Sequence, residues 1–197
     1  MCGIAGIVRS DRRDVDQELV HRMCDAIRHR GPDEDGFYFK GPVGLGMRRL
    51  AIIDLKGGQQ PIHNQDRSAW IVFNGEIYNY RELRTKLEKL GHTFYTNSDT
   101  EAIVHAYDRY GADCPRHLRG MFAFAIWDER TQELFIARDR VGKKPLLYAQ
   151  VNGEFVFGSE FSALLEHPNL SRDIEPEAIH HYLSFMCVPA PLCCTSS

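Results

Sequence analysis

The sequence predicts an α+β fold in which two antiparallel sheets lie between outer helices. Two observations support this prediction. Short β-rich segments occur in pairs joined by turn residues, as at Gly41-Pro42 and Asn152-Gly153, and such pairs are typical of antiparallel hairpins. Helical segments separate the pairs and do not follow every strand, so the chain lacks the alternating strand–helix order of a parallel sheet.

The length and composition are those of a globular protein. With 197 residues the chain can form one large domain, or one domain with a tail, and can bury a full core. The contents of 43% hydrophobic and 26% charged residues are typical of soluble proteins. A net charge of -3 without a long basic run gives no indication of nucleic-acid binding. No apolar run approaches the ~18 residues of a membrane span and no secretory signal opens the chain, so a cytoplasmic location without membrane contact is expected.

The first half of the chain contains signals for a strand, an amphipathic helix and a hairpin. Residues 4–8 are apolar and partly β-branched, which predicts a strand beside Cys2. Apolar residues recur at helical spacing over 16–28, and Arg30-Gly31-Pro32-Asp33 marks the end of this helix. Residues 36–40 and 43–50 form the predicted hairpin. The polar segment 59–66 is expected to be a loop.

The second half begins with a buried strand over residues 69–73. This run leads into Asn74-Gly75-Glu76, and Asn-Gly after a strand is most often a tight turn. Helices are predicted over 80–90 and from Ser98 to about Tyr110, where Ser98 and Glu101 have the spacing of a capping box. The remaining expected elements are strand pairs and short helices. The strands span 121–127 with 133–137 and 145–150 with 154–157, and the helices span 162–166 and 175–185.

The six cysteines give no indication of a disulfide framework or a metal site. They form no CxxC pair and no Cys/His spacing of the kind that binds zinc, so free thiols and no metal ion are expected. Cys24, within a helix, and Cys114, before a proline, are interpreted as packing residues. His29 and His63 have no ligand partner at a suitable spacing and are interpreted as structural.

The opening Met1-Cys2-Gly3 offers a specific chemistry. Methionine aminopeptidases remove Met1 when the next side chain is small, and the chain would then begin with a residue that carries a thiol and a free α-amine. The amine can accept the thiol proton, so one residue would supply both nucleophile and base. The alternative is that Cys2 is an incidental second residue, and the tripeptide alone leaves both interpretations open.

Longer motifs run through the chain in a fixed order. They are Cys2-Gly3-Ile4, Arg30-Gly31-Pro32-Asp33, Arg49-Leu50-Ala51-Ile52, Asn74-Gly75-Glu76-Ile77-Tyr78-Asn79, Ser98-Asp99-Thr100-Glu101, and the segments 120–125 and 137–146. Together they resemble class II glutamine amidotransferases, above all the glutamine-hydrolysing asparagine synthetases, over residues 2 to about 191. Glucosamine-phosphate synthases and phosphoribosylamine-forming amidotransferases share the opening cysteine but match the second and fourth motifs less well. The resemblance implies an N-terminal-nucleophile fold, a four-layer αββα sandwich.

The resemblance also implies a reaction, in which glutamine and water give glutamate and ammonia through a thioester on Cys2. The side-chain amide of Asn74 and the backbone N–H of Gly75 would stabilise the oxyanion. No histidine is required by this mechanism.

The glutamine-binding residues follow from the same resemblance. Arg49 would bind the α-carboxylate, because a guanidinium fork suits a carboxylate. Glu76 and Asp99 would bind the α-ammonium, although Asp99 could instead favour a helix N-terminus through the helix dipole. Arg48 should point to the opposite face of its strand and is given no role. The pocket-lining segment contains Leu50, Ile52 and Ile53.

The resemblance implies one amidotransferase domain over residues 2–185 and a linker or tail over 186–197, whose last six residues do not resemble the family. Full-length relatives have a second domain that uses ATP and Mg²⁺ and carries a Ser-Gly-Gly-x-Asp-Ser loop, a run that this sequence does not contain. No cofactor is expected for the first domain. The expected partners are L-glutamine and a separate ammonia-accepting synthetase domain or subunit, with a homodimer as a further option.

Two hypotheses therefore remain open at the level of sequence. In one, the chain is an active glutamine-hydrolysing domain. In the other, it is a catalytically inactive truncated remnant that binds a partner, as a truncation or a frameshift could produce.

Overall fold

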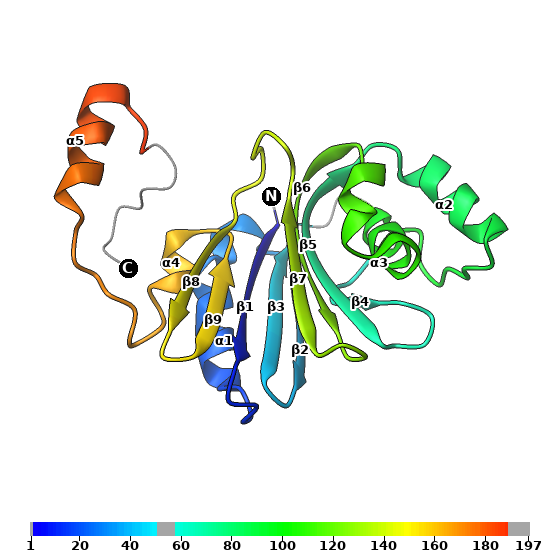
Figure 1. Ribbon diagram of the computed structural model, residues 1–197, viewed down its shortest axis with the longest axis horizontal. Helices are drawn as coiled ribbons and strands as arrows, with labels where there is room; N and C mark the ends of the chain where they lie inside the picture. The colour runs from blue at the N-terminus through cyan, green and yellow to red at the C-terminus, as the bar shows by residue number, and fades with distance from the viewer. Residues whose placement is uncertain (1, 51–57, 189–197) are drawn as a thin grey trace.

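The fold consists of two antiparallel sheets between two helical layers, as the sequence predicted (Figure 1). The computed structural model describes residues 2–50 and 58–188. The five-stranded sheet has the order β2-β3-β1-β9-β8, and the four-stranded sheet has the order β4-β5-β6-β7. The strands are β1 Gly3–Arg9, β2 Glu34–Lys40, β3 Val43–Arg49, β4 Ile62–His63, β5 Ala69–Ile77, β6 Gly120–Asp128, β7 Glu133–Arg138, β8 Leu147–Val151 and β9 Glu154–Gly158.

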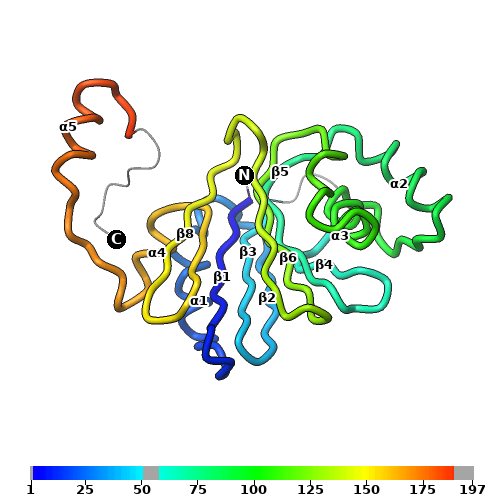
Figure 2. The backbone as a smooth tube through the Cα atoms, in the orientation of Figure 1, coloured from blue at the N-terminus to red at the C-terminus, as the bar shows by residue number. Residues whose placement is uncertain are grey.

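Each sheet is covered on its outer face by helices. The helices are α1 Gln17–Ala26, α2 Tyr80–Lys89, α3 Asp99–Tyr110, α4 Phe161–Leu164 and α5 Pro176–Phe185, with 3₁₀ turns η1 Arg28–Arg30 and η2 Gly111–His117. Helices α1 and α4 cover the five-stranded sheet, and α2 and α3 cover the other (Figure 1). Helix α5 lies apart from the sandwich at one end of the molecule (Figure 2). No helix in the described ranges is long and apolar enough to cross a bilayer.

Three apolar clusters separate the four layers. One packs α2 and α3 onto the four-stranded sheet, and a second packs α1 and α4 onto the five-stranded sheet. The third lies between the two sheets, and its fully buried members include Ile4, Leu45, Met47 and Phe157. Because side chains alternate across a strand, β1, β5, β6 and β9 each contribute to two clusters. Both sheets are therefore fixed in place by packing on both faces.

Strand β3 shows how this alternation orients the site. Gly44 and Gly46 face α1, and a Cβ atom at Gly46 would lie 2.5 Å from the Cys24 sulfur. The Arg48 side chain, on the same face, donates to the Cys24 carbonyl oxygen at 3.3 Å and to Asp35 at 2.8 Å, and also pairs with Asp25. Arg49 therefore faces the space between the sheets, which confirms that the two arginines point in opposite directions.

Burial confirms the packing role of Cys24 and Cys114. Both side chains are fully buried, and burial raises the pKa of each thiol to about 12. Such thiols are not nucleophilic near neutral pH.

Two predicted local structures differ from the observed ones. Asn74-Gly75 is not a turn, because β5 continues through it and pairs Asn74 with Ala123 and Gly75 with Phe122. The segment expected to be a loop contains the short strand β4, in which Ile62 is buried and pairs with Ile71. In both places pairing with a neighbouring strand outweighs the local turn preference.

The predicted capping box forms only in part. The Ser98 side chain accepts a hydrogen bond from the Thr100 N–H at 3.2 Å, as an N-cap does. Glu101 does not reach back to Ser98. It accepts from the N–H groups of Tyr95 and Thr96 at 2.8 and 2.7 Å and from the Thr96 hydroxyl at 2.6 Å. The buried carboxylate of Glu101 thus organises the segment that precedes α3.

A substitution at Gly36 tests how closely the chain passes over β2. A Cβ atom at this position would lie 1.8 Å from the backbone carbonyl oxygen of Gln60, which cannot swing away as a side chain can. We expect Gly36→Ala to lower the free energy of unfolding by at least about 3 kcal/mol and the melting temperature by roughly 6–12 °C. Calorimetry or chemical denaturation would measure the change.

Gly41→Ala is the matched control. A Cβ at Gly41 meets nothing within 4 Å, and only the positive φ of 53° opposes it, so a loss of about 1 kcal/mol is expected. Equal losses at the two positions would contradict the proposed clash.

Candidate active site

The candidate site lies at one end of the space between the sheets, where several strands end together. Cys2 directly precedes β1, and Arg49 is the last residue of β3. Gly3 pairs with Arg48, so Cys2 and Arg49 are neighbours across the sheet. Asn74 lies near the end of β5, in the opposite sheet. Residues separated by more than 70 positions in the sequence thereby meet at one cavity.

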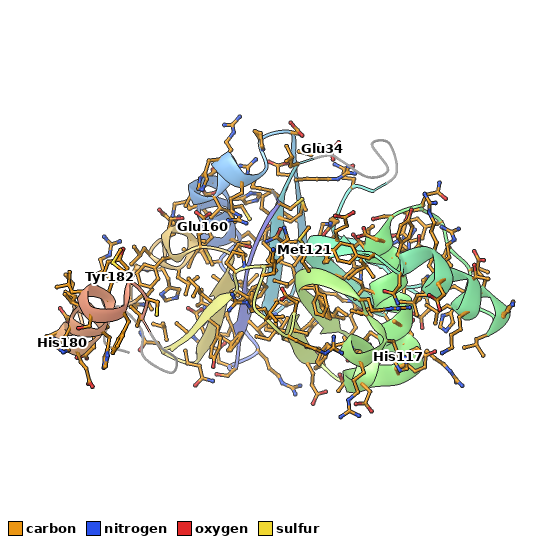
Figure 3. The ribbon with its side chains drawn as sticks, turned by 90° about the horizontal axis from the view of Figure 1, so that it is seen from above. Glu34, His117, Met121, Glu160, His180 and Tyr182 are labelled. Carbon is orange, nitrogen blue, oxygen red and sulfur yellow. The ribbon has the colours of Figure 1, made fainter. Side chains whose placement is uncertain are left out.

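The cavity has a volume of about 430 Å³ and contains every candidate residue in the described part of the chain. These residues are Cys2, Arg49, Leu50, Asn74, Gly75, Glu76 and Asp99. Ile52 and Ile53 lie outside the described residues. Figure 3 shows Met121, another lining residue, near the middle of the molecule and well away from Tyr182 and His180 on α5.

Cys2 is held in place by a hydrogen bond to its backbone. The carbonyl oxygen of Cys2 accepts a hydrogen bond from Arg30 Nε at 3.0 Å, and Arg30 is anchored in turn by Glu160 at 2.6 Å. The Cys2 thiol, which is partly buried, lies 3.7 Å from the carbonyl oxygen of Leu50. The sulfur is therefore positioned at the cavity and not sealed in the core.

The ion pair behind Cys2 is electrostatically stable. Burial opposes ionisation of Glu160, but the hydrogen bond from Arg30 and the nearby charge of His29 outweigh it, and the pKa of Glu160 stays below its ordinary value. His29 Nε2 lies 2.8 Å from the same carboxylate. His29 thus has the structural role expected from the sequence. Arg30 appeared in the sequence only as part of a motif, because no spacing rule links it to Cys2.

Asn74 has buried polar atoms without protein partners. Its side chain is 1% exposed, and neither its amide nitrogen nor its amide oxygen has a hydrogen-bond partner among the described residues. A buried polar group without a partner costs roughly 1–3 kcal/mol, so such groups are rare unless something else satisfies them. The neighbouring Gly75 has a steric reason to be glycine, because a Cβ there would lie 2.2 Å from the Met121 carbonyl oxygen.

Arg49 is a buried cation beside the cavity. Its side chain is 5% exposed, and its NH1 group lies 2.6 Å from the Glu34 carboxylate. The ion pair holds the planar guanidinium, whose fork of N–H donors suits a carboxylate, at the wall of the cavity.

Asp99 and Glu76 place acidic groups on the cavity wall. Burial raises the pKa of Asp99, and the charge of Glu76 raises it further. Hydrogen bonds from backbone N–H groups, including that of Ile77 at 2.9 Å, counteract part of this effect. Asp99 is also the first residue of α3, so it lies where the helix dipole favours a negative charge. A cation bound in the cavity would stabilise the ionised form of Asp99.

Gln60 also lines the cavity, a role that the sequence analysis did not predict. Its side-chain oxygen accepts from the Phe73 N–H at 2.7 Å, and its nitrogen donates to the Phe73 carbonyl at 3.2 Å and to the Thr100 hydroxyl at 3.3 Å. The amide therefore pairs with the residue just before Asn74. This contact joins residues 13 and 40 positions apart, which no local pattern indicates.

The segment after β7 forms one edge of the cavity through Lys143 and Lys144. Asp139 closes this turn by accepting from the N–H groups of Lys143 and Lys144 at 2.8 and 3.0 Å. Arg138 donates to the carbonyl oxygens of Gly142 and Lys144, each at 2.6 Å. Hydrogen bonds between these side chains and backbone groups therefore hold the turn.

Comparison with known proteins agrees with the fold. Two solved structures have a TM-score of 0.71 to this chain. One is the glutamine phosphoribosylpyrophosphate amidotransferase of Bacillus subtilis in complex with ADP and GMP, at 23% identity over 89% of this chain and 46% of its own. The other is described as the allosteric regulatory enzyme of purine biosynthesis, at 24% identity over 84% of this chain and 43% of its own.

Sequence relatives are more similar, and they are longer than this chain. The glutamine-hydrolysing asparagine synthetase 1 of Bacillus subtilis is 45% identical over 97% of this chain and 30% of its own length. A putative asparagine synthetase of Methanocaldococcus jannaschii is 39% identical, over 97% of this chain and 40% of its own length. Asparagine synthetase 1 of Arabidopsis thaliana is 39% identical, over 83% and 28%. The chain thus spans well under half the length of these relatives.

A family model described as a glutamine amidotransferase domain matches residues 1–197. The match covers the whole chain, and it agrees with both the two-sheet architecture and the relatives. The chain therefore belongs to the glutamine amidotransferase domain family and is similar to the N-terminal part of glutamine-hydrolysing asparagine synthetases.

Proposed function

We propose that this chain hydrolyses the side-chain amide of L-glutamine through a thioester on Cys2. The observation that supports this most directly is Asn74, whose buried amide has no partner among the described residues and lines the same cavity as the Cys2 thiol. A buried donor without a protein partner is what a developing oxyanion needs. This geometry favours an active enzyme over the inactive remnant.

The first half of the reaction forms the thioester. The Cys2 sulfur attacks the amide carbon, and the α-amine of Cys2 takes the thiol proton. The carbonyl oxygen becomes an oxyanion, which accepts hydrogen bonds from the Asn74 amide and the Gly75 N–H. When the tetrahedral intermediate collapses, the C–N bond breaks and ammonia leaves with the transferred proton.

The second half of the reaction releases glutamate. Water attacks the thioester, the same donors stabilise the second oxyanion, and the C–S bond breaks to regenerate the thiol. Both halves need a free α-amine on Cys2, so removal of Met1 is part of the proposal.

The zwitterionic end of glutamine determines the orientation of the substrate. Arg49, which Glu34 holds beside the cavity, binds the α-carboxylate through its guanidinium, and Glu76 with Asp99 binds the α-ammonium. The raised pKa of Asp99 fits this role, because a cation beside the buried carboxyl would offset its desolvation. Leu50 lines the same cavity and is proposed to contact the substrate, whereas roles for Ile52 and Ile53 stay predictions from the sequence resemblance.

In this proposal the ammonia is used outside this domain. By analogy with the longer relatives, which are named glutamine-hydrolysing asparagine synthetases, ammonia passes to a synthetase domain or a separate subunit. Use of ATP, Mg²⁺ and aspartate by that partner stays a prediction from the sequence resemblance. Self-association as a homodimer and a cytoplasmic location, both inferred from the sequence, stay predictions.

The first test is the nucleophile. Cys2→Ala should lower glutamine turnover by at least about 10³-fold and leave the circular dichroism spectrum and melting temperature unchanged. Cys187→Ala, at an exposed cysteine, should keep full activity. Intact mass must first show that Met1 is absent from both samples, because a retained methionine would block the amine. Turnover in Cys2→Ala equal to that of the parent chain would exclude the thioester route.

The second test is the oxyanion donor. Asn74→Ala should reduce kcat by about 10²–10³-fold with little change in KM, because the amide acts on the transition state more than on the bound substrate. Asn79→Ala is the matched control, since the Asn79 amide bonds the backbone of His117 and Arg119 instead. A kcat loss in Asn74→Ala no larger than in Asn79→Ala would argue against the assigned role.

The third test uses two neighbouring arginines. Arg49→Lys should raise KM for glutamine by about 10- to 100-fold, because a lysine cannot form the paired bonds of a guanidinium with a carboxylate. Arg48→Lys should leave KM within about threefold, since Arg48 faces α1 and the carboxylates of Asp25 and Asp35. If both substitutions raise KM equally, the binding site for the carboxylate lies elsewhere.

A further inference from the structure

A second group of reactive side chains lies in the outer layer formed by α2 and α3. It consists of His92, in the connection between these helices, and His105 and Asp108 on α3, and we call it the His92 cluster. One ligand-type atom from each side chain lies within 4.8 Å of the others. His105 and Asp108 are three positions apart on the helix and so share one face. None of the three residues lines the glutamine cavity.

The distance between the two imidazoles matches a shared metal ion. His92 Nδ1 and His105 Nδ1 are 3.2 Å apart. Two histidine nitrogens bound tetrahedrally to zinc, each at ~2.0–2.1 Å, lie roughly 3.3–3.4 Å from each other. Little rearrangement of the rings would therefore be needed to admit an ion.

Glu101 prepares His105 for this role. The fully buried His105 places Nε2 at 3.4 Å from the Glu101 carboxylate. Burial opposes ionisation of Glu101, but hydrogen bonds from His105, Thr96 and Tyr95 outweigh it and hold its pKa below the ordinary value. The ionised carboxylate favours the tautomer with the proton on Nε2, which leaves the Nδ1 lone pair directed at His92. Metal-binding histidines in proteins commonly have such a carboxylate behind them.

The other two ligands are also suited to a cation. His92 places its Nδ1 atom 3.2 Å from that of His105, on the side of the ring that a shared ion would occupy. Asp108 Oδ1 accepts bonds from Asn64 and Arg130, both at 3.0 Å, whereas within residues 2–50 and 58–188 Oδ2 accepts from Asn64 alone, at 2.9 Å. Each carboxylate oxygen has two lone pairs, so Oδ2 retains one for a metal ion.

The His92 cluster is accessible from outside. A hollow of about 340 Å³ is lined by His92 and Asp108 together with Gln65 and Asp66. The hollow provides an entry path and room for water as a fourth ligand. A simple hydrogen bond between the two rings would explain the 3.2 Å distance, but it would not account for the carboxylate placed beside them at the edge of an open hollow.

We propose that the His92 cluster binds one divalent transition-metal ion of the zinc class through His92, His105 and Asp108. The ion would join the segment after α2 to α3, whose first residue is Asp99 of the glutamine cavity. The sequence predicted no metal site, because two histidines 13 positions apart and an aspartate do not match a known ligand spacing. This proposal does not depend on glutamine hydrolysis.

Cobalt titration of the full chain, stripped of metal and kept reduced, tests the site. One equivalent of Co²⁺ should bind and give the visible absorption of a tetrahedral nitrogen–oxygen site, without the near-ultraviolet charge-transfer band of a thiolate ligand. That band would reveal binding to cysteine instead. Zn²⁺ should displace the cobalt, and its addition should raise the melting temperature of the stripped protein.

Variants separate the proposed site from other histidines. His92→Ala, at a partly exposed position that should tolerate the change, should weaken Co²⁺ binding by at least about 100-fold and abolish the effect of Zn²⁺ on melting. Asp108→Asn should weaken binding as well. The double variant of His180→Ala and His181→Ala, adjacent histidines on α5, is the matched control and should bind like the parent chain. Unchanged binding in His92→Ala, or no stoichiometric binding by the parent chain, would overturn the proposal.

Discussion

The pairing register between β1 and β3 is the constraint on which the site depends. Gly3 lies opposite Arg48, and this register carries Cys2 and Arg49 to the same end of the space between the sheets. Because side chains alternate with a period of two, a slip of one residue would turn Arg49 toward α1 and bring Arg48 into the cavity. Packing prevents the slip: Leu45 and Met47 fill the cluster between the sheets, and a Cβ atom at position 44 or 46 would lie within 3 Å of α1 side chains.

The cavity contains polar groups that stability alone would not select. Asn74 is buried without a protein partner among the described residues, and Asp99 is a buried carboxyl with a raised pKa. Burial of either group lowers the free energy of unfolding. In the proposed complex, the bound zwitterionic glutamine and its oxyanion would offset this loss. Hydrogen bonds hold the pKa of the buried carboxylates Glu101 and Asp139 below its ordinary value, whereas at Asp99 burial outweighs the backbone hydrogen bonds. This contrast distinguishes carboxylates that organise the fold from the one that we propose binds a cationic ligand.

Much of the fold followed from local patterns, whereas contacts between distant segments did not. Strand and helix order, the opposite directions of Arg48 and Arg49, and burial of Cys24 were predictable from periodicity. The extension of β5 through Asn74-Gly75 was not, because pairing with β6 overrides a strong turn signal. Motif resemblance supplied the candidate residues, but not the supports behind them. Arg30 beneath Cys2 and Gln60 beside Phe73 act across long sequence separations, and the His92 cluster forms only when the segment after α2 folds over α3.

The hydrogen bond from Arg30 to Cys2 has an evolutionary implication. Arg30 donates to the main-chain carbonyl oxygen of Cys2, so this hydrogen bond does not involve the side chain of the proposed nucleophile. The position of residue 2 is therefore set by its backbone and does not depend on the chemical nature of its side chain. A serine or threonine at this position would keep the same backbone hydrogen bond to Arg30. During evolution the fold could therefore exchange a thiol nucleophile for a hydroxyl without any change in the residues that hold the backbone.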